Sequence, residues 1–360
     1  MTKRLACLYL TVTLLLVGLV HPSLQGVKAQ SSTADRLGHV NQWFYYLDVN
    51  LESDVLDRVI ASNYDLVVID PIVTEANNED YDIAATVRAI QDSGNGEGQP
   101  KLVLAYIDIG EAESYRTYWQ PDWSVGNPVW IVGEDPDGWA ENYPVAFWYD
   151  EWHAIWFDGP DALLQVILDA GFDGIYLDWI EAYSDENVFA VAAAEGLDPV
   201  QEMIWFVEDI SAFVKDRDPD HIVIAQNAAE LVEYDDYVNV IDALAQEQTW
   251  FDGGGDGDNP PGDCPLPATD ADIDTPAYYE SLSPPCRELY ENYPDSTLHV
   301  SSEEYLYYLE LARDKGLFIL TVDYALEPDN VAFVYEQSRA RGFVPFASNR
   351  ALDRFIPPYP

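Results

Sequence analysis

Positive charge is scarce in this sequence of 360 residues. Lysine and arginine together number 17, against 65 aspartates and glutamates, so the formal net charge is −48. A chain this acidic repels phosphate backbones and anionic lipid headgroups, which excludes nucleic acid and anionic membrane surfaces as partners. Diffuse acidity is typical of proteins that work in high salt, whereas acidity concentrated in a cleft attracts a cationic substrate. Composition alone leaves both interpretations open.

Several motifs of catalysis and cofactor binding are also missing. The sequence contains no G-x-S-x-G elbow, no P-loop lysine motif and no dinucleotide fingerprint after its first expected strand. Beyond the N-terminal segment, the histidines are scattered and lack partners at metal-ligand spacing, so we expect no zinc and no other cofactor. The acidic stretch 252–263 departs from the EF-hand pattern and predicts a flexible loop rather than a calcium site.

The N-terminus carries an apolar run with the features of an export signal. Lys3 and Arg4 precede the apolar segment 8–20, and a small-residue cleavage site ends at Ala29. This pattern predicts a secretory signal peptide over residues 1–29, because the apolar run is short for a membrane span. No later segment is apolar enough to cross a bilayer. We therefore expect residues 30–360 to form a secreted, soluble monomer without a membrane attachment.

Cysteine is rare and its placement agrees with export. Past the signal peptide, Cys264 and Cys286 remain, both in a stretch rich in proline, glycine and aspartate. An even pair in a secreted chain predicts one disulfide that closes this loop, with two free thiols as the alternative.

Apolar runs alternate with helix-period segments along the rest of the chain. The expected strands are 43–49, 64–70, 101–109, 174–178, 221–226, 243–248, 317–324 and 343–348. The expected helices begin near 54 (with Ser53 as N-cap), 83, 159, 199 (with Asp198 as N-cap), 302 and 330. This alternation predicts an α/β fold, a single-domain (β/α)₈ TIM barrel with its core at about 43–350. Long loops follow the third and sixth strands, at 111–158 and 251–300. A doubly wound open sheet is the alternative.

Polar side chains follow most of these strands. Since the active site of a barrel lies at the carboxyl ends of its strands, these side chains are candidates for one shared site. In strand order the strand-end candidates are Asp48, Asp70, Asp108 with Glu111, Asp178 with Glu181, Gln226 with Asn227, Glu247, Asp323, and Asn349 with Arg350.

Aromatic residues accompany these polar groups. Aromatic faces stack on sugar rings and carboxylates accept hydrogen bonds from hydroxyl groups, so the combination indicates sugar chemistry. Glycoside cleavage requires two carboxyl groups that flank the bond, and Asp178 and Glu247 are the best candidates because each ends a strand beside aromatic residues. The expected substrate contacts are Asp70, Tyr106, Glu111, Trp148, Tyr176, Trp179, Gln226, Asn227, Trp250 and Asp323.

Two motifs carry a resemblance to a known family. The segment 106–119 (YIDIGEAESYRTYW) and the segment 171–183 (GFDGIYLDWIEAY) resemble glycoside hydrolase family 114, as do the later segments 322–324 and 342–345. The resemblance covers about 43–350. It implies a secreted (β/α)₈ endo-α-1,4-polygalactosaminidase whose catalytic acids follow the fourth and sixth strands. Carried onto this chain, Asp178 becomes the nucleophile and Glu247 the proton donor.

The resemblance also implies a partner. A partly deacetylated galactosamine polymer carries free amines, which an acidic barrel mouth attracts. Two alternatives stay open: a glycosidase that acts on another α-linked glycan, and a barrel that binds carbohydrate without catalysis.

Overall fold

A computed structural model describes residues 33–47, 53–252, 262–294 and 296–360. The expected signal peptide, the strand-end candidate Asp48 and most of the acidic stretch 252–263 lie outside these residues. All described secondary structure belongs to one compact unit, Ser31–Pro360. Within the described residues, no helix is both long enough and apolar enough to span a bilayer.

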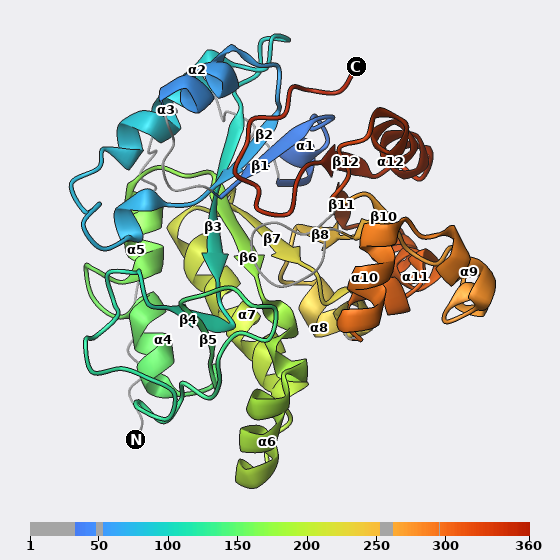
Figure 1. Cartoon of the computed structure of the whole chain (residues 1–360). Helices are drawn as coiled ribbons and strands as arrows, with labels where there is room; N and C mark the ends of the chain where they lie inside the picture. The colour runs from blue at the N-terminus through green and yellow to red at the C-terminus, as the bar shows by residue number, and fades with distance from the viewer. Residues whose placement is uncertain (1–32, 48–52, 253–261, 295) are drawn as a thin grey trace, which may run out of the picture. The chain divides into compact units, whose positions relative to one another are not determined.

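Eight parallel strands form a nearly closed barrel (Figure 1). They are, in the order in which they pair, β1 (Trp43–Tyr46), β2 (Leu66–Ile69), β3 (Leu102–Asp108), β6 (Gly174–Asp178), β7 (Ile222–Gln226), β8 (Ala243–Glu247), β11 (Phe318–Asp323) and β12 (Val344–Ala347). No described ladder pairs β1 with β12. Instead, the Trp43 indole N–H donates to the Val344 carbonyl at 3.0 Å. The TIM-barrel prediction is confirmed.

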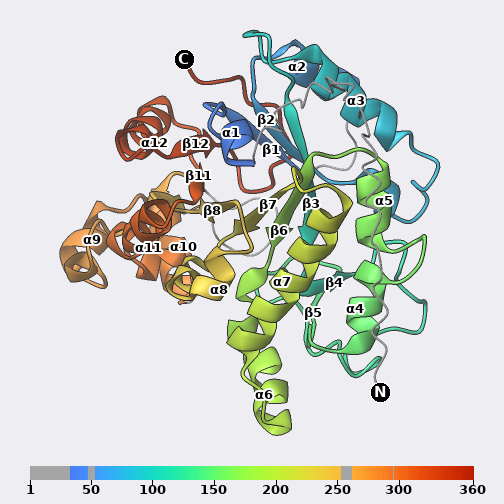
Figure 2. The ribbon, with the colours of Figure 1, turned by 180° about the vertical axis from the view of Figure 1, so that it is seen from behind.

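Helices surround the strands, as Figures 1 and 2 show from opposite sides. The helices are α1 (Thr33–Leu37), α2 (Ser53–Ala61), α3 (Ile83–Ser93), α4 (Asp150–Phe157), α5 (Leu163–Asp169), α6 (Glu186–Glu195), α7 (Pro199–Arg217), α8 (Asp235–Val238), α9 (Pro276–Ser281), α10 (Pro284–Asn292), α11 (Ser302–Asp314) and α12 (Pro328–Ala340). Ser53, the expected N-cap, is the first residue of α2, and the helix expected from 159 begins only at Leu163.

Local sequence explains the clearest of these helices. The Asp198 carboxylate accepts a hydrogen bond from the Val200 backbone N–H, and Pro199 occupies the first turn, where its missing N–H costs nothing. Buried apolar residues then recur at helical spacing through α7. In the same way, the Ser301 hydroxyl accepts from the Glu304 N–H and caps α11. The Asp198 cap agrees with the sequence prediction.

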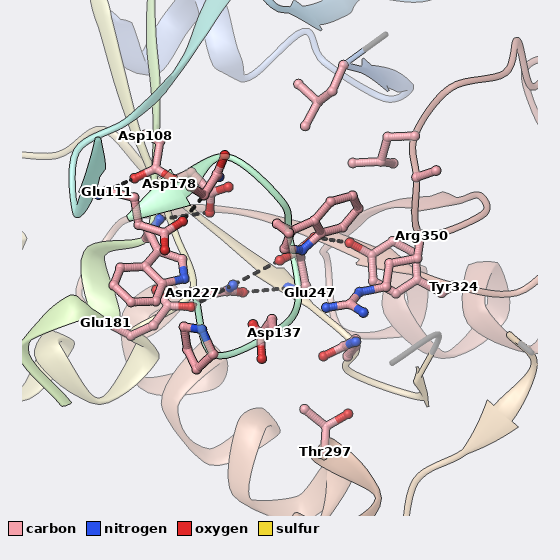
Figure 3. A pocket seen from close by; sticks show the side chains of 18 of the residues that line it. Asp108, Glu111, Asp137, Asp178, Glu181, Asn227, Glu247, Thr297, Tyr324 and Arg350 are labelled. Atoms are coloured by element: carbon pink, nitrogen blue, oxygen red, sulfur yellow. Dashed lines mark hydrogen bonds between the residues drawn. The ribbon is translucent and has the colours of Figure 1, made fainter. Parts of the chain in front are cut away.

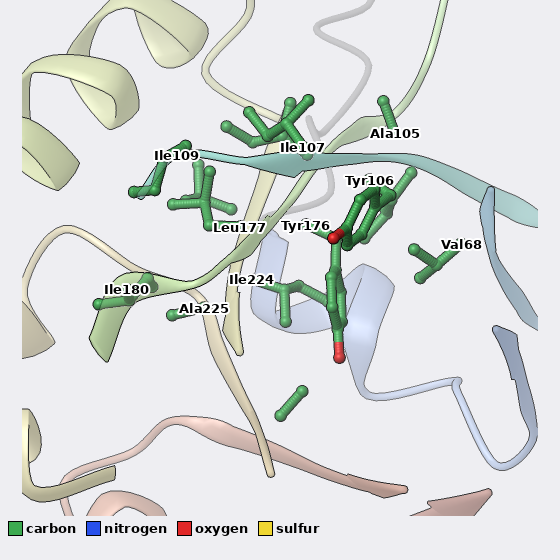
Figure 4. Packing of buried hydrophobic residues seen from close by; sticks show 14 of the residues in the cluster. Val68, Ala105, Tyr106, Ile107, Ile109, Tyr176, Leu177, Ile180, Ile224 and Ala225 are labelled. Carbon is green, nitrogen blue, oxygen red and sulfur yellow. The ribbon is translucent and has the colours of Figure 1, made fainter. Parts of the chain in front are cut away.

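The core lies inside and around the barrel. Every residue of β1, β2 and β7 is buried, because a parallel strand between barrel interior and helices is covered on both faces. Figure 4 shows β3, β6 and β7 contributing Ile107, Leu177 and Ile224 to this packing, with the rings of Tyr106 and Tyr176 close to one another. This packing holds the carboxyl ends of the strands at fixed positions.

The two long connections carry structure of their own. The first contains an antiparallel hairpin, β4 (Glu111–Glu113) and β5 (Asn142–Pro144), followed by α4. The second contains the short pair β9 (Phe251–Asp252) and β10 (Cys264–Pro265), then α9 and α10. Cys264 and Cys286 form a disulfide with a Cα–Cα distance of 5.4 Å, which confirms the predicted pairing.

Candidate active site

A pocket of about 1000 Å³ opens at the carboxyl ends of the strands. Both long connections contribute to its wall, the first through Asp137 and Trp139 and the second through residues 292–294, Ser296 and Thr297. Carboxyl groups dominate the lining: Asp70, Glu75, Asp108, Glu111, Asp137, Glu141, Asp178, Glu181, Glu230, Glu247 and Asp252. The acidity of the chain is therefore concentrated at this site as well as spread over its surface.

Asp178 ends β6 and faces the pocket. Its carboxylate accepts a hydrogen bond from the Tyr106 hydroxyl at 2.7 Å and another from the Trp179 backbone N–H at 2.8 Å. Both donors stabilise the ionised carboxylate and fix its orientation. Burial, followed by the charge of Glu247, nevertheless raises the pKa of Asp178 to about 7.

Glu247 ends β8 and lies across the pocket from Asp178 (Figure 3). The Tyr324 hydroxyl donates to one of its oxygens, and the Asn227 amide donates to the other at 2.9 Å. Asn227 also accepts from the Glu247 backbone N–H at 3.0 Å, so it holds both the side chain and the backbone of this residue. The effect of Glu247 on the pKa of Asp178 means that the two carboxyl groups interact.

Sharp backbone turns follow the strands that carry these groups. Trp179 after β6, Asn227 after β7 and Gln248 after β8 all have positive φ, at 54°, 58° and 55°. Residues with a side chain rarely adopt this conformation, and such outliers concentrate at functional sites. The turns end each strand abruptly, and those after β6 and β8 leave the terminal residues Asp178 and Glu247 in the pocket lining.

Gly110 is required by one of these turns. A Cβ atom at position 110 would lie 2.3 Å from the Trp179 carbonyl oxygen, so no larger residue fits beside the turn that follows Asp178. The packing of β3 against β6 thus depends on a glycine next to the strand end that carries Asp178.

Further carboxyl groups lie near Asp178. Burial raises the pKa of Glu181, and the charge of Asp178 raises it further, while the Asn227 amide donates to one of its oxygens at 3.1 Å. Asp108 and Glu111 belong to the same side of the pocket (Figure 3). Burial, followed by neighbouring carboxylates, raises the pKa of both. Burial and neighbouring negative charge therefore both shift these carboxyl groups toward their protonated forms.

A buried cluster of charges lies beside the pocket. Arg116 donates to both carboxylate oxygens of Asp70, at 2.8 and 2.7 Å, and to both oxygens of Glu113, at 2.7 and 2.9 Å. It also donates to the Thr74 hydroxyl at 3.0 Å. This cluster ties the first turn after β2 to the hairpin that borders the pocket.

The comparisons with known proteins agree with this geometry. The family model for glycoside-hydrolase family GH114 matches residues 25–357. The chain belongs to family GH114. Relatives in Deinococcus radiodurans (32% identical, covering 84% of this chain and 78% of the relative) and Thermotoga maritima (30% identical, covering 81% and 80%) are both uncharacterized. Family membership shows a glycoside hydrolase, which is the class predicted from the two motifs.

Two solved structures share the fold. The glycoside hydrolase domain of PelA from Pseudomonas aeruginosa has a TM-score of 0.53 at 16% identity, covering 88% of this chain and 97% of that one. Ega3 from Aspergillus fumigatus, solved in complex with galactosamine, has a TM-score of 0.51 at 14% identity, covering 88% and 93%. At these identities the likeness concerns the barrel alone.

The GH114 barrel brings together only part of the predicted site. Seven of the predicted residues line the pocket: Asp70, Tyr106, Glu111, Asp178, Trp179, Asn227 and Glu247. Among them, Asp70 already accepts from Arg116 on both oxygens, so part of its accepting capacity is used within the protein.

The other five predicted contacts lie outside the pocket lining, so the structure does not bring them together with the first seven. The Gln226 amide oxygen accepts from the Tyr45 hydroxyl, and Tyr176 is fully buried in the barrel. Asp323 is also fully buried, where it accepts from the backbone N–H groups of Trp250 and Phe251. The Trp250 and Trp148 indoles donate to Ser338 and Glu195. These side chains turn toward the core or toward loops instead of the ligand space.

Sequence reasoning also missed residues of the site. Trp139, Tyr305 and Tyr324 line the pocket but are not among the predicted contacts. Tyr324 directly follows β11. It could have been found by the reasoning that selected Glu247, which takes polar residues at the carboxyl ends of predicted strands as site candidates. Trp139 could not, because its place depends on the path of a long connection.

No group of three or more His, Cys, Asp and Glu side chains within the described residues is arranged to hold a metal ion.

The interaction between the two acids can be measured directly. Replacing Glu247 with glutamine removes the second-largest cause of the raised Asp178 pKa, so we expect this pKa to fall clearly below 7. It should stay above the ordinary value, because burial remains. Carbon-13 NMR titration of the carboxyl signals measures this shift. The control Glu336→Gln, at an exposed position of α12, should leave it unchanged, and an unchanged pKa in Glu247→Gln would show that the pair does not interact.

Proposed function

We propose that this GH114 protein is an endo-glycosidase that hydrolyses α-1,4-linked, galactosamine-containing polysaccharide. The observation that carries the proposal is the pair Asp178 and Glu247 in a pocket whose charged lining residues are carboxyl groups with the exception of Arg350. Two carboxyl groups are the minimum for glycoside cleavage, and the remaining acids suit a substrate with positive charge.

The two acids take different roles. The Asp178 carboxylate attacks the anomeric carbon, while Glu247 gives its proton to the departing glycosidic oxygen. The product is a glycosyl ester on Asp178 and a shortened chain that leaves with a free hydroxyl group. Glu247 then removes a proton from water, which attacks the ester and releases the sugar.

The electrostatics of the pocket agree with these roles when the substrate carries an amine. In the free protein, burial and the charge of Glu247 raise the pKa of Asp178 to about 7. An ammonium group beside Asp178 favours its ionised form. Entry of an amino sugar would thus leave the nucleophile charged.

The surrounding side chains would bind the sugar rings. Trp179 and Tyr106 offer aromatic surface, and Glu111 and Asn227 offer hydrogen-bonding groups on the same wall. Ega3, the fold neighbour, was solved with galactosamine, which supports an amino sugar as the ligand class. The disulfide between Cys264 and Cys286 supports an oxidising location, so we place the protein outside the cell as a soluble monomer.

The test is a set of α-linked polymers that differ in charge. The purified protein should release oligosaccharides from partly deacetylated α-1,4-galactosamine polymer, and far less from its fully N-acetylated form. Binding to the charged polymer should weaken about tenfold or more between roughly 0.05 and 0.5 M salt, because salt screens attraction in an open cleft. Cleavage of neutral α-glucans instead would identify another α-glycan as substrate. Binding without cleavage of any polymer would identify a carbohydrate-binding barrel.

A further inference from the structure

Charge is distributed unevenly around the catalytic pair. Figure 3 shows Asp108, Glu111 and Asp178 together on one side, and Tyr324 and Arg350 on the other, with Glu247 between the two groups. Among the described residues that line the pocket, Arg350 is the one lysine, arginine or histidine. The pocket therefore has a carboxyl side and an arginine side.

Arg350 is held by the first long connection. Its guanidinium carbon lies 5.2 Å from the centre of the Trp139 ring, a cation–π contact between a residue three positions beyond β12 and the loop before β5. Both side chains line the pocket. This contact restrains the position of the guanidinium, whose N–H groups are hydrogen-bond donors.

Arg350 also lies close to the proposed proton donor. Its positive charge lowers the pKa of the Tyr324 phenol, against the larger raising effects of burial and Glu247. The Tyr324 hydroxyl in turn donates to Glu247. The arginine side of the pocket is therefore the side on which Glu247 would protonate a departing sugar.

The two sides differ in the ligand groups that they accept. An ionised carboxylate only accepts hydrogen bonds, so the carboxyl side suits an ammonium group with its three donors. A guanidinium only donates and repels a second cation, so the arginine side suits an acceptor such as an N-acetyl carbonyl or a sugar hydroxyl. Asp137 also lines the pocket, but it is exposed, where solvent and salt screen its charge.

We propose that Arg350, stacked on Trp139, selects the sugar on the leaving-group side of the cleaved bond and favours an N-acetylated unit there. This inference rests on the proposed function, because it uses the roles of Asp178 and Glu247. The sugar that reacts with Asp178 carries a free amine, and the sugar that leaves is N-acetylated. The protein thus cuts preferentially at junctions between deacetylated and acetylated units.

The experiment examines the chain ends created by cleavage. A polymer with about half of its amines acetylated at random is digested, and new reducing ends are labelled by borodeuteride reduction. Tandem mass spectrometry then identifies the sugar at each end. In the wild type we expect about a tenfold preference for N-acetylated units at new non-reducing ends, and free amines at new reducing ends.

Three variants separate the causes. Arg350→Gln should lose most of the preference at non-reducing ends and keep the preference at reducing ends, whereas Arg350→Lys, which retains the charge, should keep a measurable part. Arg58→Gln is the matched control, because Arg58 stacks on Phe355 at 4.2 Å without lining the pocket, and it should behave as the wild type. Circular dichroism melting verifies that each variant is folded.

The possible failures are distinct. Wild-type products whose non-reducing ends follow the overall acetyl content would overturn this inference alone, as would an Arg350→Gln variant with wild-type ends. If the wild type releases no products from any amino-sugar polymer, the proposed function fails and the inference falls with it.

Discussion

Asp178→Asn and Glu247→Gln should each abolish hydrolysis, with kcat falling on the order of 10⁴-fold. An amide at position 178 cannot attack the anomeric carbon, and an amide at position 247 cannot give up a proton. Both replacements keep the shape of the side chain, and the amide oxygen introduced by Asp178→Asn can still accept from the Tyr106 hydroxyl. Steady-state assays on the charged polymer measure the loss. Glu208→Gln, an exposed carboxyl group on α7, is the control and should retain full activity.

The same change at position 178 should make the protein more stable at alkaline pH. The folded-state pKa of Asp178 is about 7, above the value of roughly 3.9 in an unfolded chain. The folded state therefore holds this proton more tightly, and it loses stability as the pH rises through this window. A neutral amide removes that cost, so Asp178→Asn should gain about 1–3 kcal/mol at pH 8 and nothing below pH 4. Chemical denaturation at the two pH values measures the difference. Lost activity without this gain would contradict the raised pKa.

Azide distinguishes the roles of the two acids. With an α-glycoside that carries a good leaving group, azide should restore turnover to Asp178→Gly as a β-glycosyl azide, because azide replaces the missing nucleophile on the opposite face. For Glu247→Ala it should give the α-glycosyl azide, since Asp178 still forms the first ester. The reverse outcome would exchange the roles. Appreciable turnover without azide in either variant would remove that residue from the mechanism.

Much of the barrel could be predicted because its strands are buried on both faces. Such strands appear as short apolar runs, and each of the eight expected runs contains one observed strand. Helices α4 and α6 were not predicted, because their sequences carry no comparably clear pattern. Each is ten residues or fewer, and its apolar residues are not confined to one helical face, so its sequence lacks a clear amphipathic pattern.

The proposed catalytic acids could be predicted for a related reason. A carboxyl group that directly ends an apolar strand lies at the barrel mouth whatever the loops do, and both Asp178 and Glu247 do so. The substrate contacts could not be chosen in this way. Asp323 also ends a strand, yet it bonds to the backbone of the loop after β8, because loop packing decides which strand-end groups reach the pocket. Arg116 pairs with Asp70 across 46 residues of sequence, which no local pattern shows.

This pairing leads to a second large effect, on stability. Arg116, Asp70 and Glu113 have side-chain exposures of 3%, 6% and 5%, so replacing Arg116 with methionine leaves two carboxyl groups buried without their cation. Breaking one partner of a buried ion pair costs about 3–5 kcal/mol. We therefore expect the free energy of unfolding to fall by this amount in Arg116→Met at pH 8. Arg217→Met, which breaks an exposed pair with Asp169, should cost no more than about 0.5 kcal/mol.

The pH dependence of this loss shows whether charge or packing causes it. Burial already raises the pKa of Asp70, and Arg116 opposes that rise, so the variant raises this pKa further. A folded-state pKa above the unfolded value means that stability falls as the pH rises through the interval between them. The deficit of Arg116→Met should therefore be larger at pH 8 than at pH 5, and the neutral combination with Asp70→Asn and Glu113→Gln should recover much of it. Urea denaturation at both pH values provides the measurement. A deficit equal at the two pH values and unchanged in the neutral combination would assign the loss to packing of the arginine side chain rather than to the buried charges.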